Sequence, residues 1–251
     1  MHIASVHAHP DDSEILAGGT LARLAAFGHR ITIVTMTPGD CGSAEHSPVE
    51  IAAIRRGEAA AAAALIGATY RCAEFRDLAI FNDDPSRRRV TGLLRELVPD
   101  VILTASPVDY LCDHENTSAL VRDACFGACA PNYAPGVSPA LPRIPHLYFM
   151  DAIGGTDREG RPILADFYVD IAATFATKRA MLACHESQRA WLRKQHGIDD
   201  YLETMERWTR EVGRRADCEF AEGFRRYPGH PYPQTPVLED LLASGHSRAI
   251  A

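Results

Sequence analysis

The chain has 251 residues, of which 46% are hydrophobic and 24% charged, and its formal net charge is −7. This length and balance suit one large globular domain with a buried core, and they do not require a second domain. The acidic excess disfavours nucleic acid or an anionic membrane as a partner, because both need clustered Lys and Arg. The longest apolar run, which contains the alanines at residues 59–64 and ends at residue 66, is far too short to span a bilayer.

Targeting and redox features point to the cytoplasm. The N-terminus has no basic region followed by an apolar core and a small-residue cleavage site, so no export signal is predicted. The seven cysteines are scattered without a Cys-x-x-Cys pair, which favours reduced thiols over a disulfide framework or a metal clip.

Strands and helices alternate along the first 150 residues. Short apolar runs rich in β-branched side chains predict strands at residues 3–8, 30–37, 70–75, 101–105 and 147–150. Helical periodicity with capping residues predicts helices at residues 13–28, 48–65, 86–97 and 115–128, the first of them capped by Ser13. The alternation predicts an α/β fold in which a doubly wound, mostly parallel sheet carries helices on both faces.

The C-terminal part is less regular. A last strand is predicted at residues 167–171, followed by helices at 173–194 and 198–215. We expect a single domain over residues 1–226 and a Pro- and aromatic-rich tail, residues 227–251, that packs on the domain or on a neighbouring subunit. The irregular stretches 131–145 and 227–236 carry aromatic side chains that something should cover, so a homo-oligomer is expected.

Two polar loops follow predicted strands, and in a parallel sheet the loops after such strands lie at the same edge. Ligands in such folds bind at that edge, outside the carboxyl ends of the strands. The first is His9-Pro10-Asp11-Asp12, and the second ends in Asp113-His114-Glu115. An imidazole and two carboxylates directly after a buried strand are costly to desolvate without a partner. A divalent metal is one such partner; the alternative is that Asp12 caps a helix and His9 is merely hydrogen-bonded.

The second loop favours the metal. His9, Asp12 and His114 would supply three protein ligands and leave one position for water, which is typical of catalytic rather than structural zinc. Zinc lowers the pKa of its bound water to roughly 7, which provides a nucleophile at neutral pH. Asp11 is adjacent but not needed as a ligand, so it can serve as the general base. His7 alternates with His9 on the strand and is interpreted as a supporting or core residue.

At this point the chain resembles the PIG-L, or LmbE-like, zinc-dependent N-deacetylases. The His9–Asp12 tetrapeptide is similar to the family's Ala-His-Pro-Asp-Asp signature. Further motifs in the family's order are Thr37-Pro38-Gly39-Asp40, Arg55 with Glu58, Asp77, Asp113-His114, Lys178 with His185-Glu186-Ser187-Gln188, and Ala221-Glu222-Gly223-Phe224. The resemblance therefore covers most of the chain.

The resemblance implies a Rossmann-like fold and a hydrolase that removes an N-acyl group, most often N-acetyl, from an amino sugar or a related small molecule. It implies His9, Asp12 and His114 as metal ligands, zinc as the metal (iron or cobalt also fit), and Asp11 as general base. Arg55 and Asp77 match positions that contact sugar hydroxyls or shape the pocket. The resemblance also implies trimers or hexamers.

One position departs from the family. Many members carry a His three residues before the last ligand, where it stabilises the tetrahedral intermediate, and here that residue is Leu111. Losing such a donor typically costs about 10²–10³ in rate. Tyr110 could replace it, and so could His185, His146 or His230.

The departure leaves open a second reading, a metal- or sugar-binding protein with weakened catalysis. A nucleotide-binding Rossmann protein is disfavoured, because the acidic first loop repels phosphate.

Overall fold

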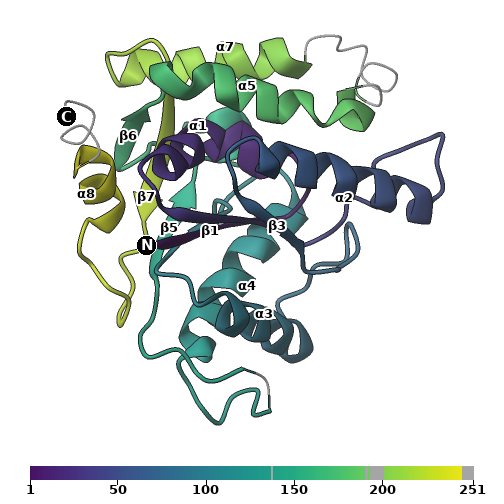
Figure 1. Ribbon diagram of the computed structural model, residues 1–251, viewed down its shortest axis with the longest axis vertical. Coiled ribbons are helices and arrows are strands. Elements are labelled where there is room, and N and C mark those ends of the chain that lie inside the picture. Colours follow the sequence, from purple (N-terminus) through teal and green to yellow (C-terminus); the bar gives the residue numbers. More distant parts are fainter. Residues whose placement is uncertain (137, 190–191, 193–200, 245–251) are drawn as a thin grey trace.

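The computed structural model describes residues 1–136, 138–189, 192 and 201–244. Its centre is a seven-stranded sheet in the order β3-β2-β1-β4-β5-β7-β6. Helices α1, α2, α5 and α7 cover one face of the sheet, and α3 and α4 cover the other (Figure 1). The doubly wound α/β single domain predicted from the sequence is thus confirmed.

The strands β1 to β5 are parallel, and the last two are antiparallel to their neighbours. Their bounds are β1 His2–His7, β2 Arg30–Thr35, β3 Thr69–Cys72, β4 Val101–Thr104, β5 His146–Met150, β6 Phe167–Asp170 and β7 Ala221–Arg226. In β1, Ile3 packs in one apolar cluster, whereas Ala4 and Val6 pack in another on the opposite face. Because β1 is buried on both faces, it fixes the position of the loop that follows it.

The helices mostly match their predicted places. Their bounds are α1 Asp12–Ala26, α2 Pro48–Ala64, α3 Asp84–Leu97, α4 Cys112–Ala128, α5 Phe175–Ala183, α7 Tyr201–Arg215 and α8 Val237–Ser244. Ser47 forms a capping box with Glu50 at the start of α2, which accounts for the sharp beginning of that helix. Among the described segments, no helix combines the length and apolar character needed to cross a membrane.

Three sequence-based expectations about these elements were wrong. Strand β7 was missed because its sequence, Ala-Glu-Gly-Phe-Arg-Arg, lacks an apolar run. The helix expected at residues 173–194 is interrupted: α5 ends at Ala183, and residues 186–189 and 192 are helical again, whereas residues 190–191 and 193–200 lie outside the described part. Ser13 does not cap α1, because the helix already begins at Asp12 and the Ser13 hydroxyl instead bonds to Ser5 at 2.8 Å.

Strand β7 locks helix α1 in place through one buried carboxylate. The Glu222 oxygens accept hydrogen bonds from the backbone N–H groups of Gly19 and Thr20, at 2.9 and 2.7 Å. Lys178 of α5 donates to the same carboxylate at 2.7 Å, and both side chains of this ion pair are buried. A buried charge needs such complete pairing, and the result is that α5, β7 and α1 hold one another.

Residues 227–244 lie against the same domain. Tyr232 is buried, and its hydroxyl donates to the backbone carbonyl of Arg122 in α4. Tyr227 packs edge-on against Phe149 of β5, with ring centroids 5.8 Å apart. Helix α8 continues this segment directly after residues 227–236, the stretch expected to be irregular; no helix was predicted at its position. The homo-oligomer stays a prediction.

Candidate metal centre

The two polar loops meet at the carboxyl ends of the adjacent parallel strands β1 and β4. Asp12 is the first residue of α1, and His114 lies in the first turn of α4. Helix α4 begins at Cys112, three residues earlier than predicted. The sheet therefore brings residues about one hundred positions apart into one cluster, as the topology rule predicted.

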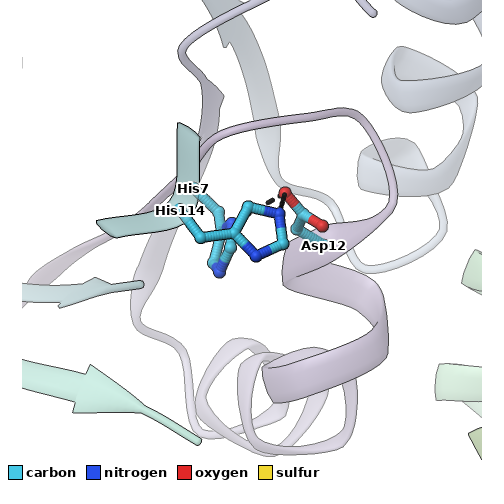
Figure 2. A group of neighbouring side chains, drawn as sticks. All are labelled: His7, Asp12 and His114. Atoms are coloured by element: carbon cyan, nitrogen blue, oxygen red, sulfur yellow. Dashed lines mark hydrogen bonds and ion pairs between the residues drawn. The ribbon is translucent and has the colours of Figure 1, made fainter. Parts of the chain in front are cut away.

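One carboxylate oxygen stands at the centre of this cluster. Asp12 Oδ2 lies 2.7 Å from His7 Nδ1, 3.3 Å from His9 Nδ1 and 3.4 Å from His114 Nε2. Figure 2 shows the side chains of His7 and His114 converging on Asp12. Three imidazoles around one buried carboxylate oxygen form a donor set that suits a divalent ion of the zinc type.

Two of these imidazoles are each held by a second carboxylate. Asp113 bonds His9 Nε2 at 3.1 Å, and Asp109 bonds His114 Nδ1 at 3.0 Å. The nitrogen left on each ring, His9 Nδ1 or His114 Nε2, faces Asp12. A ligating histidine in metalloproteins normally has its remote nitrogen fixed in this way. His114 Nε2 is moreover buried without a hydrogen-bond partner, which a bound ion would remedy.

His7, interpreted from the sequence as a supporting or core residue, is also close enough to the centre to be a possible metal ligand. Suitable ligand atoms of His7, Asp12 and His114 all lie within 4.8 Å of one another, so His7 could replace His9 in the ligand set. However, Asp12 and the Ala8 N–H already occupy its Nδ1, at 2.7 and 2.8 Å. Its other nitrogen, Nε2, is buried without a partner, as is His114 Nε2, so the preference for His9 rests on the carboxylate that holds its ring. The alternation along β1 that puts His7 and His9 on one face was the available signal.

The charged groups of this cluster shift one another's pKa values. Burial opposes a charge on His9, but hydrogen bonds to Asp113 and Asp12 raise its pKa to about 9. Burial likewise opposes a charge on His114, yet Asp12 and Asp109 raise its pKa to about 10. The pKa of Asp12 falls well below its usual range, since His7 and His114 outweigh its burial. Without an ion, protons hold these groups together, and metal binding must displace them.

Asp11 is adjacent to the cluster, and one of its oxygens, Oδ2, contacts residues outside it. Its backbone adopts the left-handed conformation with φ 102°, which is unusual for a residue other than glycine and typical of strained functional turns. Its Oδ2 accepts a hydrogen bond from the Tyr201 hydroxyl at 2.6 Å and lies 3.6 Å from Arg55 Nη2. Burial raises the pKa of Asp11, and the positive charge of Arg55 opposes that rise.

Tyr201 was not predicted as a site residue. It opens α7, 190 residues after Asp11, and its sequence context suggests only an amphipathic helix. Burial, and next the charge of Asp11, raise the pKa of its hydroxyl well above the usual value. The hydroxyl therefore stays protonated and donates to Asp11.

The two residues expected at sugar hydroxyls are committed to the protein backbone. Arg55 is 4% exposed, and its guanidinium donates to the carbonyl of Pro10 at 2.6 Å. A Cβ atom at Gly39 would lie only 2.3 Å from Arg55 Nη1, so the glycine is what allows the loop to cover Arg55. Asp77 Oδ2 accepts a hydrogen bond from the Cys41 N–H at 2.8 Å. Both residues shape the loops that enclose the site.

The candidates for replacing the missing donor at Leu111 are scattered. Tyr110 is 65% exposed, and its ring meets His114 edge-on with centroids 5.6 Å apart. His185 is fully buried and faces Glu14 at 3.6 Å. His146 pairs with Val101 at the amino ends of β5 and β4, and His230 lines a groove at the far end of α4. Both of these lie away from the cluster, so naming them was wrong.

A doubly wound α/β sheet with a His-and-Asp cluster at the carboxyl ends of its central strands defines an enzyme of the Rossmann-like class. Comparison with known proteins specifies the family. Residues 4–125 match the family model of PIG-L, the GlcNAc-PI de-N-acetylases. This stretch belongs to the PIG-L, or LmbE-like, family, as its motifs predicted.

Three relatives show how the likeness extends over the rest of the chain. The 4-oxalmesaconate hydratase of Pseudomonas putida is 28% identical over 191 residues, which cover 73% of this chain and 72% of the hydratase. The diacetylchitobiose deacetylase of Thermococcus kodakarensis is 24% identical over 244 residues, 90% of this chain and 83% of that protein. The solved N,N'-diacetylchitobiose deacetylase of Pyrococcus horikoshii has the same fold, with a TM-score of 0.77, 24% identity and coverage of 94% and 88%.

Proposed function

We propose that the chain is a zinc-dependent hydrolase that removes an N-acyl group, N-acetyl among them, from an amino sugar or a related small-molecule amine. One observation carries this proposal. The imidazoles of His9 and His114 each contact Asp12 through one ring nitrogen, and a second carboxylate holds the other nitrogen of each ring. On that ground His9, Asp12 and His114 are the proposed ligands, with Asp113 and Asp109 positioning the two imidazoles and His7 holding Asp12. The family and the deacetylase relative support the choice of an amide bond.

The roles of the chain's own groups follow from their contacts. A divalent ion bound here supplies Lewis acidity and lowers the pKa of water to about 7. Asp11 Oδ2 is engaged by Tyr201, which leaves Oδ1 to take a proton from the attacking water. The protonated Asp11 then returns the proton to the nitrogen of the leaving amine. Arg55 donates a hydrogen bond to the carbonyl of Pro10 and so helps to fix the backbone that carries Asp11 and Asp12.

The hydratase relative defines the competing class, in which water adds to a carbon–carbon double bond. The same cluster could activate water for either reaction, so the two are separated by what the rest of the site binds. Amide hydrolysis is favoured because the matching family model is that of de-N-acetylases and one of the relatives is a deacetylase.

Release of acetate from N-acetylglucosamine derivatives by the zinc-loaded protein tests the proposal. We expect turnover that chelation abolishes and zinc restores. A panel of N-acyl amines without any metal-dependent release, together with hydration of an unsaturated dicarboxylate, would assign the chain to the hydratase class. Zinc binding without either reaction would instead support the reading as a catalytically weakened binding protein.

Tyr110 and Tyr201 provide a test of how the loss at Leu111 is compensated. If Tyr110 donates to the developing oxyanion, Tyr110→Phe should lower kcat tenfold or more with zinc content and KM unchanged. Tyr201→Phe removes a hydrogen bond to the base instead, so its kcat loss should come with an altered pH profile. The measurement is kcat and KM between pH 5 and pH 9 at verified zinc occupancy. An unchanged kcat in Tyr110→Phe would exclude Tyr110 and direct attention to His185.

A further inference from the structure

Large apolar side chains are exposed around the metal centre. Leu78 is 62% exposed, Phe81 58%, Val108 39% and Tyr110 65%. We call these four residues the apolar rim. They lie on the two loops, residues 73–83 and 105–111, that follow strands β3 and β4. Exposed apolar side chains that cluster in this way mark a binding surface, because leaving them in water is unfavourable.

The apolar rim is continuous with the first turn of α4, which carries His114. The Leu78 N–H donates to Asp113 Oδ2 at 2.7 Å, the same oxygen that contacts His9. Asn116 donates to the carbonyl of Ile80 at 2.8 Å, directly before Phe81. The Tyr110 ring lies edge-on against His114. These contacts place the rim at the mouth of the centre rather than on a separate face.

Leu78 reaches this position at a cost in backbone energy. Its φ is 60°, in the left-handed region that a branched side chain rarely adopts. The surrounding structure holds it there through the bond from its N–H to Asp113. Arg55 and Asp77 are meanwhile hydrogen-bonded to backbone groups, and Arg55 Nε and Asp77 Oδ1 are buried without a partner. The side chains that these two loops expose beside the centre include the four of the apolar rim.

We propose that the apolar rim binds an apolar acyl group, so that the substrate is an amine carrying an acyl chain of several carbons or an aryl acyl group rather than a simple acetamide. This inference rests on the proposed amide hydrolysis and names its substrate class. Each methylene removed from water increases binding about fourfold. A chain four methylenes longer than acetyl, half covered by the rim, should therefore bind at least tenfold more tightly.

The test compares N-acetylglucosamine with N-hexanoylglucosamine on the zinc-loaded protein. We expect kcat/KM to favour the hexanoyl amide by at least tenfold. Leu78→Asn keeps a residue that tolerates a left-handed backbone but removes the apolar side chain, and Phe81→Ser removes the second; each should reduce that preference to about threefold or less. The matched control is Leu65→Asn, because Leu65 is similarly exposed at 53% but lies at the end of α2; it should keep the full preference.

Equal kcat/KM for the two amides, or a preference that survives both rim substitutions, would overturn the inference. A second arm separates it from the proposed function: calorimetry with hexanoate and acetate on the zinc-loaded protein needs no turnover. A further outcome is that neither amide is hydrolysed while hexanoate binds at least tenfold more tightly than acetate and loses that advantage in Leu78→Asn. That result would support the apolar rim as an acyl-binding surface and contradict the proposed amide hydrolysis. Light scattering that shows a dimer lost in Leu78→Asn would make the rim an interface between copies and overturn the assignment.

Discussion

Replacing Asp11 by Asn is expected to lower kcat by about 10²–10⁴-fold while the protein keeps its zinc. The carboxylate is next to the proposed ligand Asp12 in the chain and is not itself a proposed ligand. An amide has nearly the same volume and can still accept from the Tyr201 hydroxyl, whose oxygen lies 2.6 Å from Asp11 Oδ2. The change therefore removes the base and little else. Steady-state kinetics at saturating substrate, with zinc measured on the same sample, provide the result.

A matched control for this substitution is Asp240→Asn on α8, which makes the same chemical change far from the centre. Its kcat should equal that of the unmodified protein. If Asp11→Asn also retained more than about a third of the original kcat, the general base would have to be another residue, and His185 near Glu14 would be the first to examine.

Substitution of the histidines should divide them into ligands and a supporting residue. His9→Ala and His114→Ala each remove one of three proposed ligands, and we expect both to lose stoichiometric zinc after dialysis. His7→Ala removes the hydrogen bonds that His7 Nδ1 makes with Asp12 and with the Ala8 N–H, and loss of such a support weakens metal affinity by about 10–100-fold. Competition with a chromophoric chelator measures the three dissociation constants on one scale.

The opposite ranking has a definite meaning. If His7→Ala lost its zinc and His9→Ala retained it, the ligand set would be His7, Asp12 and His114, whose ligand atoms also lie close together. Acidification adds a check on either set. Because the pKa of His9 is raised to about 9 and that of His114 to about 10 in the ion-free protein, binding must release protons. Zinc affinity should therefore fall as the pH is lowered from 9 to 6.

The parts of the fold that the sequence predicts well are those whose signals are local. The run Ile3–Ala8 and the residues after it specify strand, turn and helix within about 25 positions, and Val101–Ala128 does the same for the second half of the centre. The parallel order of β1 and β4 then follows from packing rules that hold for nearly every such sheet. As a result, Asp12 and His114 could be placed together from the sequence.

Other features depend on contacts that no local pattern encodes. Strand β7 is held by its neighbours β5 and β6 rather than by its own weak propensity. Tyr201 looks like any aromatic residue of an amphipathic helix until the fold brings it to Asp11. Asp109 could be seen only as a loop acid, and its bond to His114 depends on how the loop turns back. The contact of Arg55 with the carbonyl of Pro10 was hidden for the same reason, because the loop that covers Arg55 could not be positioned from the sequence.

The hydrogen bonds between Glu222 and helix α1 affect how the metal centre forms during synthesis of the chain. Residues 9–12 leave the ribosome well before the other parts of the site, because the hydroxyl that holds Asp11 belongs to a residue 190 positions later. The carboxylate that holds α1, Glu222, follows later still. At about 5–20 residues per second, a nascent chain waits roughly 10–40 s between these events. During that interval the helix behind the first loop lacks its clamp, so a ribosome-bound chain stopped before Tyr201 should take up zinc more weakly than the released protein.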